Sequence, residues 1–134
     1  TAGWTFNGFA GIIRNGSVFE AADAPEGTQA AYIQTLNGTS GQFYQDAVLP
    51  AGRYILRFQA AKRTSFGGQQ TFDVYAGDRL IGSFAPAAGA YQPYETDDFT
   101  LTQPEKIRIR FEATSTSGDN TAFIDQVQII RISD

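Results

Sequence analysis

The most informative stretch of the chain reads GDNTAFIDQV and spans Gly118–Val127. It opens with Gly, Asp and Asn, residues that favour a turn. β-Branched and aromatic residues follow, and one acid, Asp125, is set among apolar neighbours. The stretch therefore predicts a turn that leads directly into a terminal β-strand.

The rest of the chain repeats this pattern, with short β-branched or aromatic runs separated by Gly, Pro, Asn and Asp. No window of helical length keeps an apolar period of about 3.6 residues, and we expect at most one helical turn, near Ala21–Pro25. The pattern predicts an all-β fold, a two-sheet antiparallel β-sandwich. The nine predicted strands are Trp4–Phe9, Gln29–Thr35, Gln42–Leu49, Arg53–Ala61, Thr71–Tyr75, Leu80–Phe84, Asp97–Thr102, Lys106–Glu112 and Ala122–Ile132.

The composition narrows the class of protein. A chain of 134 residues fits a single domain over residues 1–134, with one packed core. His, Cys and Met are absent, which removes disulfides, thiolate and imidazole chemistry and leaves oxygen-ligand metals such as calcium. A net charge of −4 argues against nucleic acid as a partner. No apolar run approaches the roughly 20 residues that cross a bilayer, so we expect a soluble protein without a membrane partner.

Alternation within two strands sorts their side chains into two faces. In the fourth predicted strand Arg57 and Gln59 alternate with apolar residues, and in the eighth Arg108 and Arg110 do so. A solvated outer surface is the ordinary explanation for such polar rows. The functional hypothesis is that a curved sheet gathers these four side chains into one groove of fixed hydrogen-bond donors.

Aromatic residues in loops supply the second ingredient of a sugar site, because a pyranose ring presents an apolar C–H face as well as hydroxyl groups. Phe66 lies in the segment that ends at Gln70, where neighbouring glycines leave little apolar cover, and both residues are candidates. Tyr91 and Tyr94 form a second cluster of possible ligand contacts. The alternative is that one of them, Tyr94, fills the edge of the core and contacts no ligand. We expect Trp4, the single Trp of the chain, to lie in the core.

Three segments resemble one family in order and spacing. They are Pro25–Gln34, Ala51–Phe58 and Gly118–Val127, and together they resemble the galactose-binding-domain-like jelly rolls that serve as carbohydrate-binding modules. The resemblance extends over nearly the whole chain. It implies a jelly-roll fold and a non-catalytic role in binding polysaccharide.

The resemblance also ranks the candidate sugar contacts. On the strand that corresponds to the concave face of such modules, it points first to Gln59 and Arg63, with Tyr91 from the facing loop and Arg110 from the strand after it. Family members commonly carry a Trp on this strand, whereas residues 58–63 of this chain contain none. This departure favours a shallower or more polar site. The full set of candidates is Arg57, Gln59, Arg63, Phe66, Gln70, Tyr91, Arg108 and Arg110.

A structural calcium ion is a further implication of the resemblance. Related jelly rolls hold calcium between an acid near the N-terminus and an Asp of the last strand, and Asp125 matches the second position. The upstream acid of the family pattern is missing, so Glu20 or Glu26 would have to replace it. The alternative is that Asp125 caps nearby backbone amides without a metal.

Three classes of function follow from these features. The absence of His and Cys excludes Ser-His-Asp and Cys-His catalysis, and none of the 14 acids lies in a recognisable catalytic motif, so we expect no enzyme activity. The favoured function is a carbohydrate-binding module that targets a secreted bacterial enzyme or surface protein to a polysaccharide. Plant-wall β-glucan and xylan are the expected ligands, and the arginines leave acidic glycans open. A protein-binding adhesion or structural module is the alternative.

Because Thr1 follows neither Met nor a signal peptide, we expect a piece of a larger, extracellular multidomain protein.

Overall fold

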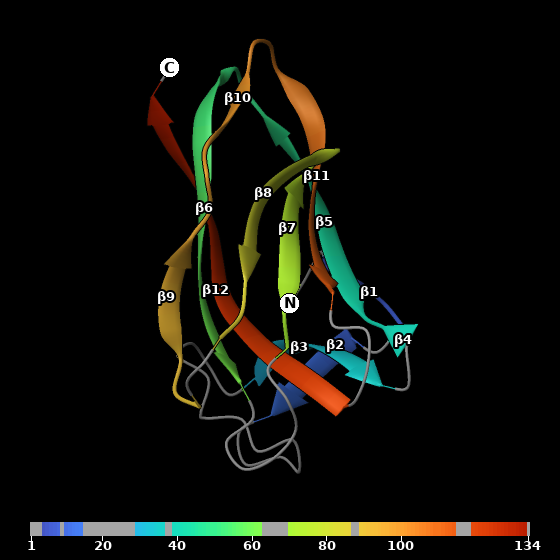
Figure 1. Ribbon diagram of the computed structural model, residues 1–134. Coiled ribbons are helices and arrows are strands. Elements are labelled where there is room, and N and C mark those ends of the chain that lie inside the picture. Colours follow the sequence, from blue (N-terminus) through green and yellow to red (C-terminus); the bar gives the residue numbers. More distant parts are fainter. Residues whose placement is uncertain are drawn as a thin grey trace.

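The chain forms two layers of β-sheet, as Figure 1 shows for the computed structural model. Twelve β-strands make up the regular structure of the described residues, and no helix that could cross a membrane is found among them. The structure describes residues 4–8, 10–14, 29–36, 39–62, 70–86, 89–114 and 119–133.

Both sheets are antiparallel. The five-stranded sheet has the order β1-β5-β11-β7-β8, and the seven-stranded sheet has the order β10-β6-β12-β3-β2, with β4 added beside β3 and β9 beside β6. The strands of the first sheet are β1 (Thr5–Asn7), β5 (Gln42–Leu49), β7 (Phe72–Ala76), β8 (Arg79–Phe84) and β11 (Glu105–Ala113). Those of the second are β2 (Ala10–Arg14), β3 (Gln29–Leu36), β4 (Thr39–Ser40), β6 (Gly52–Lys62), β9 (Gln92–Glu95), β10 (Phe99–Leu101) and β12 (Asp119–Ser133).

The core lies between the sheets and is rich in phenylalanine. Phe111 of β11 is fully buried, stacks on Phe43 of β5 with ring centroids 4.8 Å apart and meets Phe58 of β6 edge-on at 5.3 Å. Because Phe58 belongs to the opposite sheet, this contact joins the two layers. Aromatic pairs in offset or edge-on geometry add about 0.5–1.5 kcal/mol beyond the area that they bury.

Two aromatic residues at the margin of the core have the positions that their sequence context suggested. Trp4 packs against the core, edge-on to Phe43 at 5.1 Å, which confirms the expectation of a core residue. Tyr94 stacks on Phe58 at 5.8 Å and meets Phe84 at 5.7 Å. Tyr94 therefore closes the edge of the core and is not available as a platform for a ligand.

The prediction of an all-β sandwich is confirmed, although the strand list was incomplete. Three strands were missed, β2, β4 and β9. The short β2 shows no clear alternation, β4 has only two residues, and β9 contains Pro93, which cannot donate to a sheet ladder. Pairing with β6 at the margin of the sheet explains why proline is tolerated there. The helical turn expected near Ala21–Pro25 lies outside the described residues.

A β-bulge divides β12 into two halves. Asp125 pairs with Gln59 of β6 and Gln128 pairs with Arg57, so two residues of β12 stand against one of β6. Gln126, inside the bulge, has a φ of 51°, a left-handed conformation that is uncommon for residues other than glycine. The N-terminal half of β12 is paired on both sides, by β3 and β6, whereas β3 makes no pair beyond Ile124 among the described residues.

Candidate functional site

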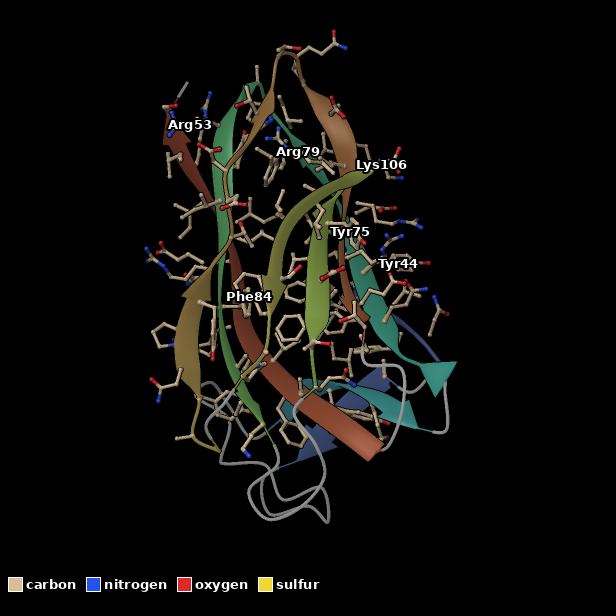
Figure 2. The ribbon with its side chains drawn as sticks, viewed as in Figure 1. Tyr44, Arg53, Tyr75, Arg79, Phe84 and Lys106 are labelled. Carbon is tan, nitrogen blue, oxygen red and sulfur yellow. The ribbon has the colours of Figure 1, made fainter. Side chains whose placement is uncertain are left out.

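The candidate residues occupy two opposite outer faces of the sandwich. Arg57 and Gln59 lie on β6 of the seven-stranded sheet, and Arg108 and Arg110 lie on β11 of the five-stranded sheet. In both strands the alternate residues are buried in the core, so these four side chains point away from the other sheet. Figure 2 shows the same separation, with Tyr44 and Lys106 on one side of the molecule and Arg53 on the other. The hypothesis of one groove built from all four residues is therefore wrong.

On the five-stranded sheet, Arg108 is engaged by its own sheet. Its guanidinium donates from Nε to Asp46 Oδ1 at 2.8 Å and from Nη2 to Oδ2 at 3.2 Å, and its carbon lies 3.9 Å from the ring centroid of Tyr44. The hydrogen bond from Arg108 lowers the pKa of Asp46, and burial opposes this shift only in part. Since the folded carboxyl has the lower pKa, the stability that the pair supplies is present above pH about 4 and is lost as the pH falls through the folded value.

Arg110 is held in a similar way one cross-strand row further along. Its guanidinium lies 4.3 Å from the ring centroid of Tyr75 on β7, and its Nη2 lies 3.4 Å from Glu112 Oε2. Arg110 Nε is buried and has no hydrogen-bond partner within the described part of the chain. On the outer face of this sheet, the guanidinium groups of Arg108 and Arg110 are thus already engaged by tyrosine rings and carboxylates of the same sheet.

The outer face of the seven-stranded sheet has a different character. Asp125 of β12 lies directly opposite Gln59 of β6, and Gln59 lies opposite Pro93 of β9, so a carboxylate, an amide and an apolar ring form one cross-strand row. Both Asp125 and Gln59 are half-buried. The next row toward the bulged half of β12 holds Arg57, whose Nε donates to Glu95 Oε2 at 2.8 Å. A row of this kind offers hydrogen-bond donors and acceptors at fixed positions.

The adjoining end of this outer face is covered. Phe123 and Thr121 alternate with the core residues of β12 and so face outward, yet both are fully buried. Ala61 pairs with Phe123 and is also buried, and Gln34 of β3, which pairs with Thr121, is 7% exposed. Polar groups in such a place need partners, and Thr121 Oγ1 has none within the described residues. The face therefore has a covered end beside an open, polar row.

Tyr91 lies where these two parts meet. It comes directly before β9, one residue past the pair of Ala60 and Gln92, and it is half-buried. Burial raises the pKa of its phenol above the ordinary value, and the negative charge of Asp125 raises it further, which places the two side chains near each other. The Tyr91 hydroxyl is buried without a hydrogen-bond partner in the described residues. A ligand hydroxyl or a water molecule would satisfy it and offset a cost of about 1–3 kcal/mol.

The raised pKa of Tyr91 predicts a specific alkaline behaviour. In the unfolded chain a tyrosine ionises near pH 10, whereas the folded Tyr91 stays neutral to higher pH. The contribution of Tyr91 to stability is therefore complete below pH about 10 and is lost as the pH rises through the folded value. Spectrophotometric titration of the folded protein should show a late-ionising phenol that is missing in Tyr91→Phe. Identical titration curves for the two proteins would contradict this.

The remaining candidates fall into two groups. Gln70 is fully buried in the structure, so it is wrong as a surface contact for a ligand. Arg63 and Phe66 lie outside the described residues, and their role stays a prediction.

The acids of the described residues do not gather into a metal-binding group. No group of three or more acids is found among them, and Glu20 and Glu26 lie outside them. Asp125 is the one acid of the expected pair that the structure describes, and it faces the outer row with Gln59.

Sequence reasoning missed several residues of this face, although a signal for them was present. In β3 and β12, residues that alternate with Ile33 and Ile124 must face outward, and this rule places Tyr32, Thr121, Phe123 and Asp125 on one face. Register then sets Phe123 opposite Tyr32. The pairing of β12 with both β3 and β6 could not be read from the individual strands, and this pairing is what brings these residues together.

Comparison with known proteins defines the fold. The sequence matches no protein-family model and no curated protein. Among solved structures, the carbohydrate-binding module TmCBM61 in complex with β-1,4-galactotriose is similar, with 19% identity, a TM-score of 0.65, and 98% of this chain and 90% of that chain covered. The CBM22-1 xylan-binding domain of Paenibacillus barcinonensis Xyn10C has 14% identity and a TM-score of 0.68, with 100% and 88% covered.

The same fold also occurs in a protein of another class. A cyclase from Fischerella sp. TAU in complex with 4-(1H-indol-3-yl)butan-2-one has 16% identity and a TM-score of 0.67, and the match covers 98% of this chain and 86% of the cyclase. At such identities the likeness establishes the fold and leaves the function to the site. The chain has the jelly-roll β-sandwich fold that these structures share.

Proposed function

We propose that the protein is a non-catalytic carbohydrate-binding module whose site is the outer face of the seven-stranded sheet. The observation that carries the proposal is the cross-strand row of Asp125, Gln59 and Pro93 with the half-buried Tyr91 beside it. A flat ring next to planar amide and carboxylate groups matches the apolar face and the hydroxyl groups of a sugar. In this proposal the module belongs to a larger extracellular bacterial protein and holds it on a polysaccharide.

Neutral plant-wall polysaccharides are the favoured ligands. One neighbour of the same fold is in complex with β-1,4-galactotriose, a neutral sugar, and another is a xylan-binding domain. Four arginines left acidic glycans open, and three of them pair with carboxylates in the described structure: Arg57 with Glu95, Arg108 with Asp46 and Arg110 with Glu112. The fourth, Arg63, lies outside the described residues. An acidic polymer would have to compete with each of these carboxylates, and Asp125 in the row would repel it.

The alternative of a protein-binding module has less support. A docking surface for protein is expected to present a contiguous apolar patch. The exposed large apolar side chains of the described residues are spread over β5, β8 and β12, on both sheets. They are Val48, Leu80, Ile129 and Ile132.

Substitutions on the two outer faces test the proposed site. Gln59→Ala should weaken retention by a neutral polysaccharide in affinity electrophoresis by roughly three- to tenfold, the effect of one neutral hydrogen bond. Arg108→Ala is the matched control, because it changes an outward residue of the other sheet. A panel of xylan, galactan, β-glucan and a uronate polymer identifies the ligand. If Arg108→Ala weakens retention and Gln59→Ala does not, the site lies on the five-stranded sheet. Release of reducing sugar by the pure protein would contradict a non-catalytic role.

A structural calcium ion at Asp125 is a separate proposal, supported by the position of this acid in the last strand. If the ion is bound, it stabilises folding by mass action, and EDTA should lower the midpoint of thermal unfolding. Asp125→Asn should have the lower midpoint already and should be insensitive to EDTA. If EDTA leaves the melting curve of the parent protein unchanged, the proposal of a structural calcium ion is wrong.

A further inference from the structure

A pocket lies between the two sheets, away from their outer faces. Its volume is about 160 Å³, and it opens where β5 of one sheet faces the bulged half of β12 in the other. The lining consists of Trp4, Gln45, Ala47, Ile109, Val127 and Ile129.

The strand arrangement explains why space is left at this point. Val127 lies in the bulge and Ile129 follows it, in the part of β12 that β3 does not pair within the described residues. Ala47 is a small residue in the core-facing row of β5, so it does not fill the gap below them. Ile129 is 37% exposed, which marks the mouth of the pocket.

The lining is apolar with one exception. Gln45 belongs to the same core-facing row as Phe43 and Ala47, a row in which an amide is unexpected, and it is half-buried. A water molecule held in such a space needs two to four polar partners, and this wall offers one amide side chain. An engineered cavity of about 150 Å³ with a lining of Leu, Ile and Phe stays dry and binds benzene. The volume and the chemistry of the pocket thus suit a single aromatic ring better than water.

We propose that this pocket binds a small aromatic molecule of one ring that carries one hydrogen-bonding group, as a phenol does. The ring contacts Trp4, Val127 and Ile129, and the polar group meets the Gln45 amide. A sugar is excluded as the occupant, since most of its hydroxyl groups would lose their hydrogen bonds to water without replacement. The pocket is independent of the proposed glycan site, because it opens between the sheets.

The single tryptophan makes the proposal directly testable. Trp4 lines the pocket, so its emission should change on titration with toluene or p-cresol when it is excited where phenols do not absorb. For ligands of seven or eight heavy atoms we expect dissociation constants of roughly 0.1–1 mM. Isothermal titration calorimetry of the same pairs provides a second readout that does not depend on fluorescence.

Three variants separate the pocket from other surfaces. Ala47→Leu should fill it and abolish binding of both probes, and Val127→Phe should do the same if Ala47→Leu fails to fold. Val48→Leu is the matched control, because Val48 is the next residue of β5 and is 76% exposed on the opposite face. Gln45→Leu should reduce the preference for p-cresol over toluene by roughly three- to tenfold. The proposal is overturned if neither probe binds the parent protein, or if a folded, filled variant binds as tightly as Val48→Leu.

Discussion

Phe111→Ala should lower the free energy of unfolding by about 3–5 kcal/mol, the largest effect on stability that we expect from a single substitution. Phe111 is fully buried, stacks on Phe43 in its own sheet at 4.8 Å and meets Phe58 of the other sheet at 5.3 Å. Removal of the ring leaves a cavity between the layers and deletes both contacts. Because domains of this size are stable by only about 5–15 kcal/mol, the variant should unfold at a clearly lower urea concentration.

Two further variants serve as controls for the loss of stability in Phe111→Ala. Phe111→Leu keeps most of the apolar volume and should cost roughly 1–2 kcal/mol, between a volume-conserving swap and a truncation. Lys106→Ala, an exposed position on the same strand, should change the stability by no more than about 0.5 kcal/mol. A Phe111→Ala protein that is as stable as Lys106→Ala would show that the two sheets do not meet at this residue.

The sandwich was predictable because its strands carry their own signals. The alternation in β6 and β11 identified both the strands and their buried faces, and the structure buries those faces. Strands with weak local patterns were not predicted. For example, β9 contains Pro93, and its place in the sheet depends on its pairing with β6. Local sequence encodes the side-chain period of a strand, whereas pairing between distant strands depends on the packing of the whole domain.

The candidate site was predictable only in part, for the same reason. Gln59 and Tyr91 could be selected as polar and aromatic residues with the right neighbours, and the structure brings both close to Asp125. Alternation alone could not tell that β6 and β11 belong to different sheets, so Arg108 and Arg110 were wrongly added to the same groove. A polar face is recognisable from one strand, but which polar faces join is a property of the sheet order.

The loss of the Tyr91 ring is expected to have the largest effect on ligand binding. Tyr91→Ala should weaken binding of the identified glycan by about 1–3 kcal/mol, which is roughly 5- to 150-fold, because the ring offers the apolar surface next to Asp125 and Gln59. Isothermal titration calorimetry with a soluble oligosaccharide measures this change. The melting midpoint should fall far less than in Phe111→Ala, since Tyr91 is only half-buried and precedes a strand at the sheet margin.

Tyr91→Phe and Tyr75→Ala distinguish the cause of that loss. Tyr91→Phe keeps the ring and removes the hydroxyl group that lacks a partner in the described structure, so it should retain most of the affinity and lose at most about tenfold. Tyr75 is also half-buried, but it lies below Arg110 on the outer face of the five-stranded sheet. Tyr75→Ala should therefore bind the glycan as the parent does. A loss of binding in Tyr75→Ala together with unchanged binding in Tyr91→Ala would place the glycan on the outer face of the five-stranded sheet. On that face the rings of Tyr44 and Tyr75 lie beside Arg108 and Arg110.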